Sequence, residues 1–240
     1  MNYLILSANV RDDNDYLDEW ITYHLSIGFE KIIIYDHLSK IPVKAEWGNN
    51  VIVYRLERES LFQPEFIHNF TLKNHKSFWM AHFDVDEFVV LLQHEDIKNL
   101  LASYEDRGAL GIPWSMFGSS GHILKPKGLV KDNYLYRRPD EFMWCKSIIN
   151  TQFCTRIDDP HHGIYTKKAV NEAFEEFEGP QCDSPRKLIK LNHYFTRSLE
   201  EYKRKIERGT GNPQTPQRPL QWLYDIDKLA TIYDDTLKNK

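Results

Sequence analysis

The chain has 240 residues, a mass of 28.5 kDa and a formal net charge of −4 at pH 7. This length suffices for one large hydrophobic core, and the negative charge argues against a broad electrostatic grip on nucleic acid. Its three cysteines lack the spacing of a zinc site or a disulfide framework. No apolar run approaches the roughly 20 residues that span a bilayer, and the first residues lack the basic region of a signal peptide. We therefore expect a cytoplasmic protein without a transmembrane segment.

The first third of the chain alternates strand-like and helix-like segments. We expect strands at 3–8, 31–35, 51–55 and 78–83, and helices at 12–27 and 62–75. In the first helix, apolar residues recur at three- and four-residue spacing and Gly28 follows as a stop signal. This alternation predicts a mostly parallel sheet with helices on its faces, in which ligands bind beyond the carboxyl ends of the strands.

Three carboxylates interrupt the most apolar stretch of the sequence, at Asp84, Asp86 and Glu87. If the strand continues through them, Asp84 and Asp86 project to the same side, where they repel each other unless a cation compensates. Mg²⁺ and Mn²⁺ take oxygen ligands and keep coordination positions open for substrate phosphates. The pattern therefore indicates a site for a metal ion and a diphosphate. The alternative is a solvated turn, which the flanking apolar runs disfavour.

The second half has the same mixed character. A helix is expected at 96–107, strands at 110–117, 129–138, 144–156 and 187–194, and a helix at 199–208 that begins with a Ser198/Glu201 capping box. Residues 210–219 hold three prolines and are typical of a linker, and 220–237 forms a last amphipathic helix. We divide the chain into a domain of residues 1–209, a linker of 210–219 and a C-terminal helix of 220–240. The apolar face of that helix needs cover from its own core or from a partner or second copy.

A short run of small residues follows the expected strand at 110–117. In Phe117-Gly-Ser-Ser-Gly-His122 the backbone can approach a ligand closely and offer N–H and hydroxyl donors. The alternative is a plain turn.

Five ordered motifs resemble glycosyltransferase family 92 and its bacterial and viral relatives, which are related to family 2. They are Tyr16-Leu-Asp-Glu-Trp-Ile-Thr-Tyr-His24, Ile34-Tyr-Asp-His-Leu-Ser39, Asp84-Val-Asp-Glu-Phe88, Phe117-Gly-Ser-Ser-Gly-His122 and His193-Tyr-Phe-Thr-Arg-Ser-Leu-Glu-Glu-Tyr-Lys203. The resemblance covers about residues 3–209, and Arg197 stands where the pattern has lysine. It implies a GT-A fold, a Rossmann-like α/β arrangement with a mixed central sheet flanked by helices.

The resemblance also implies an activity, the transfer of a sugar from a nucleotide donor, expected to be UDP-linked, to a glycan or glycoconjugate hydroxyl. Mn²⁺ or Mg²⁺ would bridge the diphosphate and stabilise the leaving group. Asp86 is the first expected metal ligand, and Asp84 is a second ligand or a ribose contact. A late histidine would complete the set, with His193 preferred and His162 second. The alternative for either histidine is a structural role in the core.

Further roles follow from the same resemblance. Uridine would be held by Ala8, Asn9, Arg11 and Asp36, although Arg11 would in the alternative simply pair with Asp12 or Asp13. Gly121 and His122 would lie at the donor sugar or the acceptor. If the reaction inverts the anomeric centre, a carboxylate must deprotonate the acceptor. Asp140 and Glu141 are preferred for that base over Asp158 and Asp159.

Two other functions remain open on the sequence. A metal-dependent nucleotidyltransferase or phosphohydrolase also uses paired carboxylates, but it needs further ones for a second ion, and only Glu87 is adjacent. The other is a non-catalytic module that binds a nucleotide sugar.

Overall fold

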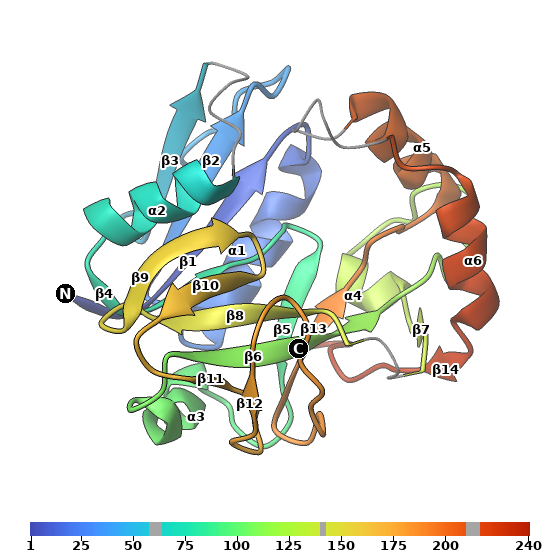
Figure 1. The fold of residues 1–240 in the computed structure, drawn as a ribbon. Helices are drawn as coiled ribbons and strands as arrows, with labels where there is room; N and C mark the ends of the chain where they lie inside the picture. Colours follow the sequence, from blue (N-terminus) through green and yellow to red (C-terminus); the bar gives the residue numbers. More distant parts are fainter. Residues whose placement is uncertain (58–63, 140–142, 210–216) are drawn as a thin grey trace.

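The computed structural model describes residues 1–57, 64–139, 143–209 and 217–240. Within these residues, a ten-stranded sheet runs through the molecule and helices cover both of its faces (Figure 1). Its path is β12-β11-β6-β8-β4-β1-β2-β3, and β13 pairs with both β6 and β5. The arrangement confirms the expected α/β class, a mixed central sheet flanked by helices. In the described part of the chain, no helix has the length and apolar character needed to cross a membrane.

Four parallel strands form the N-terminal half: β1 (Asn2–Val10), β2 (Lys31–His37), β3 (Val51–Leu56) and β4 (Ser77–His82). Their side chains alternate between two cores. Leu4 and Leu6 of β1 belong to the core that contains the apolar face of α1 (Leu17–Ser26). Ile5 instead packs with Ile67 of α2 (Pro64–Asn74). Apolar residues occupy both odd and even positions of these strands. The strands are therefore buried on both faces, as expected for a parallel sheet.

The second half of the sheet is mixed. β8 (Cys145–Asn150) runs antiparallel to both β4 and β6 (Ala109–Met116), so β6 has the same direction as β4. β13 (Ile189–His193) is parallel to β6 and antiparallel to β5 (Glu87–Leu91). The short strands β11 (Ala169–Val170) and β12 (Glu176–Phe177) form one edge, and β9 (Cys154–Asp159) pairs with β10 (His162–Tyr165) beside α2. The end of β13 therefore lies at the same edge of the sheet as the end of β4.

The strand that was expected to carry both carboxylates ends before them. β4 stops at His82, and the N–H of Glu87 donates to the carbonyl of Asp84 at 2.9 Å, which closes a turn between β4 and β5. The expectation that Asp84 and Asp86 share one face of an extended strand is therefore wrong. In the turn, each of these carboxylates can face a different partner.

Several other boundaries also differ from expectation. The strand expected at 129–138 is wrong: α4 (Val130–Asn133) forms there, followed by β7 (Tyr136–Arg137). The cause is a distant side chain, because the Glu19 carboxylate accepts the N–H groups of Val130 and Lys131 at the start of α4. The expected helix at 96–107 is shorter, consisting of α3 (Ile97–Leu101) and a 3₁₀ turn (Ala102–Tyr104). A 3₁₀ turn (Asn14–Tyr16) precedes α1.

The C-terminal segment packs into the body of the protein. After α5 (Leu199–Arg208), helix α6 (Gln221–Leu229) ends eight residues before the expected 237, and β14 (Ile232–Tyr233) pairs with β7. Leu223 and Ile226 of α6 are buried, and Leu237 belongs to the main core. The segment from residue 217 onward thus packs against residues 1–209 through Leu223, Ile226 and Leu237, while Trp222 and Leu229 on the same helix stay partly exposed. Residues 210–216 of the expected linker lie outside the described residues.

A buried ion cluster fixes this segment. The Asp234 carboxylate, 5% exposed, accepts from the ammonium of Lys190 on β13 and from Nε of Arg137 on β7 at 2.6 Å. Burial alone would raise the pKa of Asp234, but the hydrogen bonds from Lys190, Thr236 and Arg137 hold it well below its usual range. The cluster ties the end of the chain to two separate strands.

Removing this carboxylate should destabilise the whole protein. We expect Asp234→Ala to lower the free energy of unfolding by about 3 kcal/mol, because Lys190 and Arg137 then lose their carboxylate in a buried position. Urea denaturation at pH 7 measures this change. The neighbouring exposed carboxylate gives the control, and Asp235→Ala should change stability by less than about 0.5 kcal/mol. Equal effects of the two substitutions would contradict the structural role of Asp234.

A neutral histidine lies in the main core. The ring of His24 is fully buried among Trp20, Tyr23 and Phe88. Its Nδ1 lies 2.8 Å from the carbonyl of Trp20, and the Val89 N–H points at Nε2 from 3.4 Å, so a neutral ring with its hydrogen on Nδ1 satisfies both contacts. Burial lowers the pKa of His24 to about 3, although the Trp20 carbonyl acts in the opposite direction.

This histidine makes stability depend on pH. An unfolded histidine titrates near 6.5, so between pH 6.5 and 3 the unfolded chain binds a proton here that the folded chain does not. The free energy of unfolding should therefore fall as pH decreases through this window, by about 1.4 kcal/mol per pH unit from His24 alone. His24→Gln removes the contribution. The stability advantage of the native chain over this variant should shrink between pH 6.5 and 5 in urea denaturation, and a constant difference would contradict the assignment.

Candidate functional site

Asp86 is the most heavily engaged carboxylate at the edge of the sheet. Its side chain is 11% exposed; Oδ2 lies 2.6 Å from the ammonium of Lys205 on α5, and Oδ1 lies 3.4 Å from Nε2 of His193 at the end of β13. Burial would raise the pKa of Asp86, but the charge of Lys205 and the hydrogen bond from His193 hold it well below its usual range. The carboxylate is therefore ionised in the folded protein.

Asp84 faces a different cation. The ammonium of Lys146, on β8, lies 3.2 Å from Oδ2 of Asp84 and 3.7 Å from Glu87. Burial favours the neutral amine, but Asp84 and Glu87 raise the pKa of Lys146, so it stays charged. Burial raises the pKa of Glu87 well above its usual range, and this side chain also accepts the N–H of Asp84 at 2.8 Å. Lys146 thus offsets the repulsion between Asp84 and Asp86.

His193 stands between Asp86 and an aromatic surface. Its ring packs against Trp114, with 4.4 Å between centroids, and against Phe195. Burial lowers the pKa of His193, which keeps the imidazole neutral at pH 7 although Asp86 acts in the opposite direction. Its buried Nδ1 has no hydrogen-bond partner within the described residues. A neutral imidazole beside an ionised carboxylate is the form in which both groups bind metal ions.

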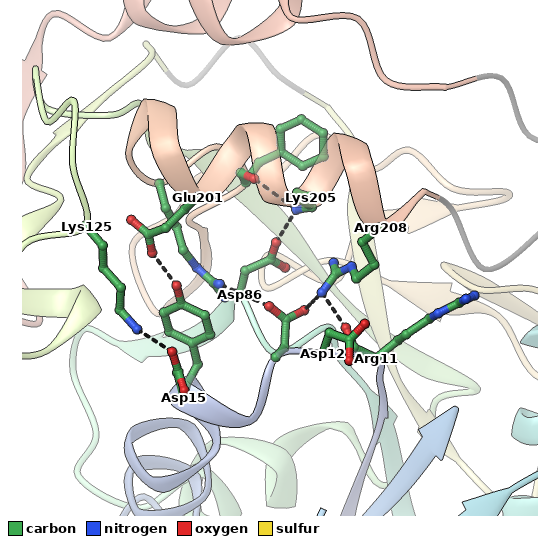
Figure 2. Close-up of polar contacts among 12 residues, drawn as sticks. Arg11, Asp12, Asp15, Asp86, Lys125, Glu201, Lys205 and Arg208 are labelled. Atoms are coloured by element: carbon green, nitrogen blue, oxygen red, sulfur yellow. Dashed lines mark hydrogen bonds and ion pairs between the residues drawn. The ribbon is translucent and has the colours of Figure 1, made fainter. Parts of the chain in front are cut away.

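Two adjoining cavities, of about 480 and 220 Å³, open beside these groups. One wall is α5 and the other is the segment after β1. The residues that line both cavities are mostly charged: Arg11, Asp13, Asp86, Phe195, Lys205 and Arg208. Figure 2 shows Lys205 and Arg208 reaching from α5 toward Asp86 and Arg11. The larger cavity is lined by acidic as well as basic side chains; its lysines and arginines suit the phosphates of a ligand, and its carboxylates suit a cation.

Asp13 holds the two walls together. Its carboxylate pairs with Arg208 and, at 3.4 Å, with Arg197, while Arg208 also donates to the carbonyl of Arg11 at 2.6 Å. The guanidinium of Arg197 stacks on the ring of Tyr16, 3.5 Å from its centroid. The hydroxyl of Tyr16 in turn donates to Glu201 of α5. The segment after β1 and helix α5 are thus joined by ion pairs, a stacked guanidinium and a buried hydrogen bond.

Local sequence explains why α5 presents these groups. Ser198 and Glu201 form the expected capping box, which fixes the start of the helix, and Tyr134 also donates to Glu201. From Glu201, positions four and seven residues on lie on the same face of a helix, and these are Lys205 and Arg208. Sequence reasoning missed both residues as site residues, although this spacing within a basic helix was a usable signal. It also missed Lys146 and Asp13, for which the sequence holds no comparable pattern.

The residues expected to hold uridine have different surroundings. Asn9 and Arg11 line the smaller cavity, and Ala8 is buried in the main core. Asp36 is 1% exposed, and both of its oxygens have partners within the chain. Oδ1 accepts the N–H of Ser39, and Oδ2 accepts the N–H of Val43 and the guanidinium of Arg55 on β3 at 2.6 Å. Burial would raise the pKa of Asp36, but these donors lower it.

The run of small residues is tied to the C-terminal helices. Ser119 donates through its N–H and its hydroxyl to the Asp227 carboxylate of α6, both at 2.6 Å. Gly121 has φ +78°, which favours glycine, and a Cβ there would contact nothing within 4 Å. The carbonyl of His122 accepts the N–H of Leu199 at the start of α5. In this structure the turn supports α5 and α6, and Gly121 and His122 do not contact Asp86.

The other expected residues lie apart or outside the description. His162 lines a separate cavity with Asp106 and Lys167, where its ring packs against Tyr165 and Phe177, so the structure does not bring it to Asp86. Asp158 and Asp159 belong to β9. The two preferred candidates for the catalytic base, at 140 and 141, lie outside the described residues.

The spacing of the possible metal ligands at the turn can be compared with that of a divalent-ion site. Ligands that each lie about 2.1 Å from Mg²⁺ are at most about 4.2 Å apart, and Asp86 and His193 approach to 3.4 Å. No group of three or more His, Cys, Asp and Glu side chains is arranged for a metal within the described residues. Mg²⁺ at a phosphate is usually held by one or two carboxylates, while substrate oxygens and water complete the shell. Asp86 fits this pattern, and His193 would add a nitrogen ligand.

Comparison with known proteins gives two similar curated sequences, and no family model matches. A glycosyltransferase family 92 protein of Ricinus communis is 26% identical over 215 residues, which are 80% of this chain and 35% of the relative. Another, from Oryza sativa subsp. japonica, is 26% identical over 263 aligned residues, with 96% of this chain and 42% of the relative covered. The chain thus spans about two-fifths or less of the length of these relatives. The resemblance expected from the five motifs is confirmed.

Among solved structures, the Staphylococcus aureus protein TarS (residues 1–349), in complex with UDP-GlcNAc, aligns with a TM-score of 0.43 and 14% identity. The alignment covers 75% of this chain and 60% of that one.

The contacts of Asp36 lead to a test of its role. If it holds the loop after β2, Asp36→Asn should lower the free energy of unfolding by about 1–3 kcal/mol, because a charged acceptor of several hydrogen bonds is lost. A residue that only contacts uridine would instead lose UDP affinity with no loss of stability. Urea denaturation and UDP titration calorimetry separate the two. Glu46→Gln, which weakens only an exposed ion pair with Lys44, should leave stability unchanged.

Proposed function

We propose that this chain transfers a sugar from a nucleotide-diphosphate donor, UDP-linked, to a hydroxyl of a glycan or glycoconjugate. The observation that carries the proposal is the meeting of Asp86 and His193 with Lys205 and Arg208 beside a cavity of about 480 Å³. The site combines oxygen and nitrogen ligands for a metal with cations for a diphosphate. Its similarity to family 92 glycosyltransferases supports sugar transfer over other reactions of diphosphates.

We assign Mn²⁺ or Mg²⁺ to Asp86 and His193, with Asp84 held beside them by Lys146. When bound, the metal offsets the negative charge that develops on the leaving diphosphate. Arg208 and Arg11 add fixed positive charge around the same diphosphate, and such preorganised charge is effective in a partly buried site. Asn9 and Arg11, which line the smaller cavity, contact the nucleoside.

The acceptor is assigned to the Trp114 side of the site. Trp114 lines the smaller cavity beside His193, and its ring also packs against Trp144 and His161. Aromatic faces of this kind offer an apolar body with a polar edge, which suits a sugar ring. The expected bases Asp140 and Glu141 precede Trp144 closely in the sequence, so the proposal keeps them for deprotonation of the acceptor.

Donor hydrolysis tests this function without knowledge of the acceptor. The protein is incubated with Mn²⁺ and a panel of nucleotide sugars, and we expect slow release of UDP from one of them. Asp86→Asn should reduce this rate by about a hundredfold, because charge stabilisation at the leaving group is lost. Asp106→Asn, at an exposed carboxylate far from the site, serves as the control.

Other outcomes would identify the alternatives. Release of pyrophosphate or phosphate would favour a metal-dependent nucleotidyltransferase or phosphohydrolase. Tight binding of a nucleotide sugar without turnover, with and without acceptors, would indicate a non-catalytic binding module.

A further inference from the structure

The ammonium of Lys205 occupies the position that a cation would take at Asp86. Its Nζ lies 2.6 Å from Oδ2 of Asp86, and the side chain is only 15% exposed (Figure 2). The same ammonium donates to the carbonyl of Phe195 at 2.9 Å and lies 4.2 Å from the centroid of its ring. In the ligand-free protein, the buried charge of Asp86 is therefore balanced from within the chain.

A divalent ion and this ammonium are competitors. Both are attracted to one carboxylate, and Arg197 and Lys146 already add positive charge nearby. Adding a metal ion alone would therefore place an excess of positive charge in a partly buried site, where repulsion is weakly screened. Metal binding without a diphosphate is opposed for as long as Lys205 keeps its position.

The cavity beside Asp86 offers Lys205 a second position. Lys205 lines both cavities together with Arg208 and Arg11, so its flexible four-carbon stem can turn from Asp86 toward a diphosphate bound there. The contacts of the ammonium with the carbonyl and the ring of Phe195 do not involve Asp86, so these groups remain available to Lys205 in either position. The diphosphate brings the negative charge that a metal ion and Lys205 together require.

We propose that Lys205 is an exchangeable counter-ion: it neutralises Asp86 in the free protein and moves to the donor diphosphate when metal and donor bind together. This rests on the proposed function. Lys205 thereby opposes the binding of metal alone and favours the binding of the metal–nucleotide pair, so it increases the coupling between the two ligands. Coupling of this kind is reciprocal between the metal and the nucleotide.

Calorimetry with Mn²⁺ and UDP tests the exchange on the full chain. In Lys205→Met, Mn²⁺ alone should bind about tenfold more tightly, because its competitor is gone, whereas UDP at saturating Mn²⁺ should bind about tenfold more weakly, because a charge-assisted hydrogen bond is lost. A merely structural lysine would weaken both equilibria or neither. Lys203→Met, on the exposed side of the same helix, should leave both unchanged.

A conservative variant guards against loss of folding. Lys205→Gln retains a polar but shorter and uncharged side chain and should show the same opposite shifts, while Lys205→Arg should retain the weak binding of Mn²⁺ alone. Unchanged or weaker Mn²⁺ binding in both Lys205→Met and Lys205→Gln would overturn the exchange. If the native chain binds neither Mn²⁺ nor UDP, the proposed function itself fails. Native binding of both ligands with no effect of Lys205 would refute only the exchange.

Discussion

The structure around the site depends on one constraint: the buried carboxylate of Asp86 must be neutralised. An ionised group in a partly buried position is costly unless it is paired and hydrogen-bonded. Both partners come from one continuous segment, because His193 ends β13 and Lys205 lies on the helix that follows. The position of α5 over the carboxyl edge of the sheet is therefore coupled to the charge on Asp86. The end of β13 and helix α5 together compensate the carboxylate of Asp86, since His193 supplies a polar contact and Lys205 supplies the positive charge.

The carboxylate of Asp84 has a different cationic partner from that of Asp86. These separate partners explain how the two acidic residues can lie close together. β8 pairs antiparallel with β4, Ala81 opposite Ile148, so that Lys146 lies just beyond the end of β4. There it pairs with Asp84, while Glu87, the third carboxyl of the turn, has a pKa well above its usual range. Negative charge at the turn is thus offset by Lys146, which pairs with Asp84 and lies 3.7 Å from Glu87. Asp86 therefore lines the cavities with Lys205 and His193 as its partners.

Much of the architecture could be predicted from the sequence, because its signals are local. The expected strands at 3–8 and 31–35 have apolar residues at both odd and even positions, and they form β1 and β2 of a sheet that is buried on both faces. The start of α5 followed from its capping box, which involves only neighbouring residues. Long-range contacts set the rest. The Glu19 carboxylate accepts backbone N–H groups at the start of α4, where a strand was expected. The ion pairs of Asp234 hold the last residues beside β7 and β13, although the apolar spacing of the sequence predicted that the last helix would continue there.

The candidate site shows the same limit at the level of single residues. Asp86 and His193 were expected together, because the family pattern carries them, and the structure places them 3.4 Å apart. Lys205 and Arg208 were not expected, although their spacing from Glu201 places them on one face of the helix, and the contacts of Asp13 depend on long-range packing that no local pattern shows. In the folded chain these charges pair with one another across the cavity. A charged ligand entering it must therefore exchange partners with the protein and does not simply add new contacts. The affinity of the site then depends on the difference between two sets of ion pairs, which makes it sensitive to the metal and to the charge of the ligand together.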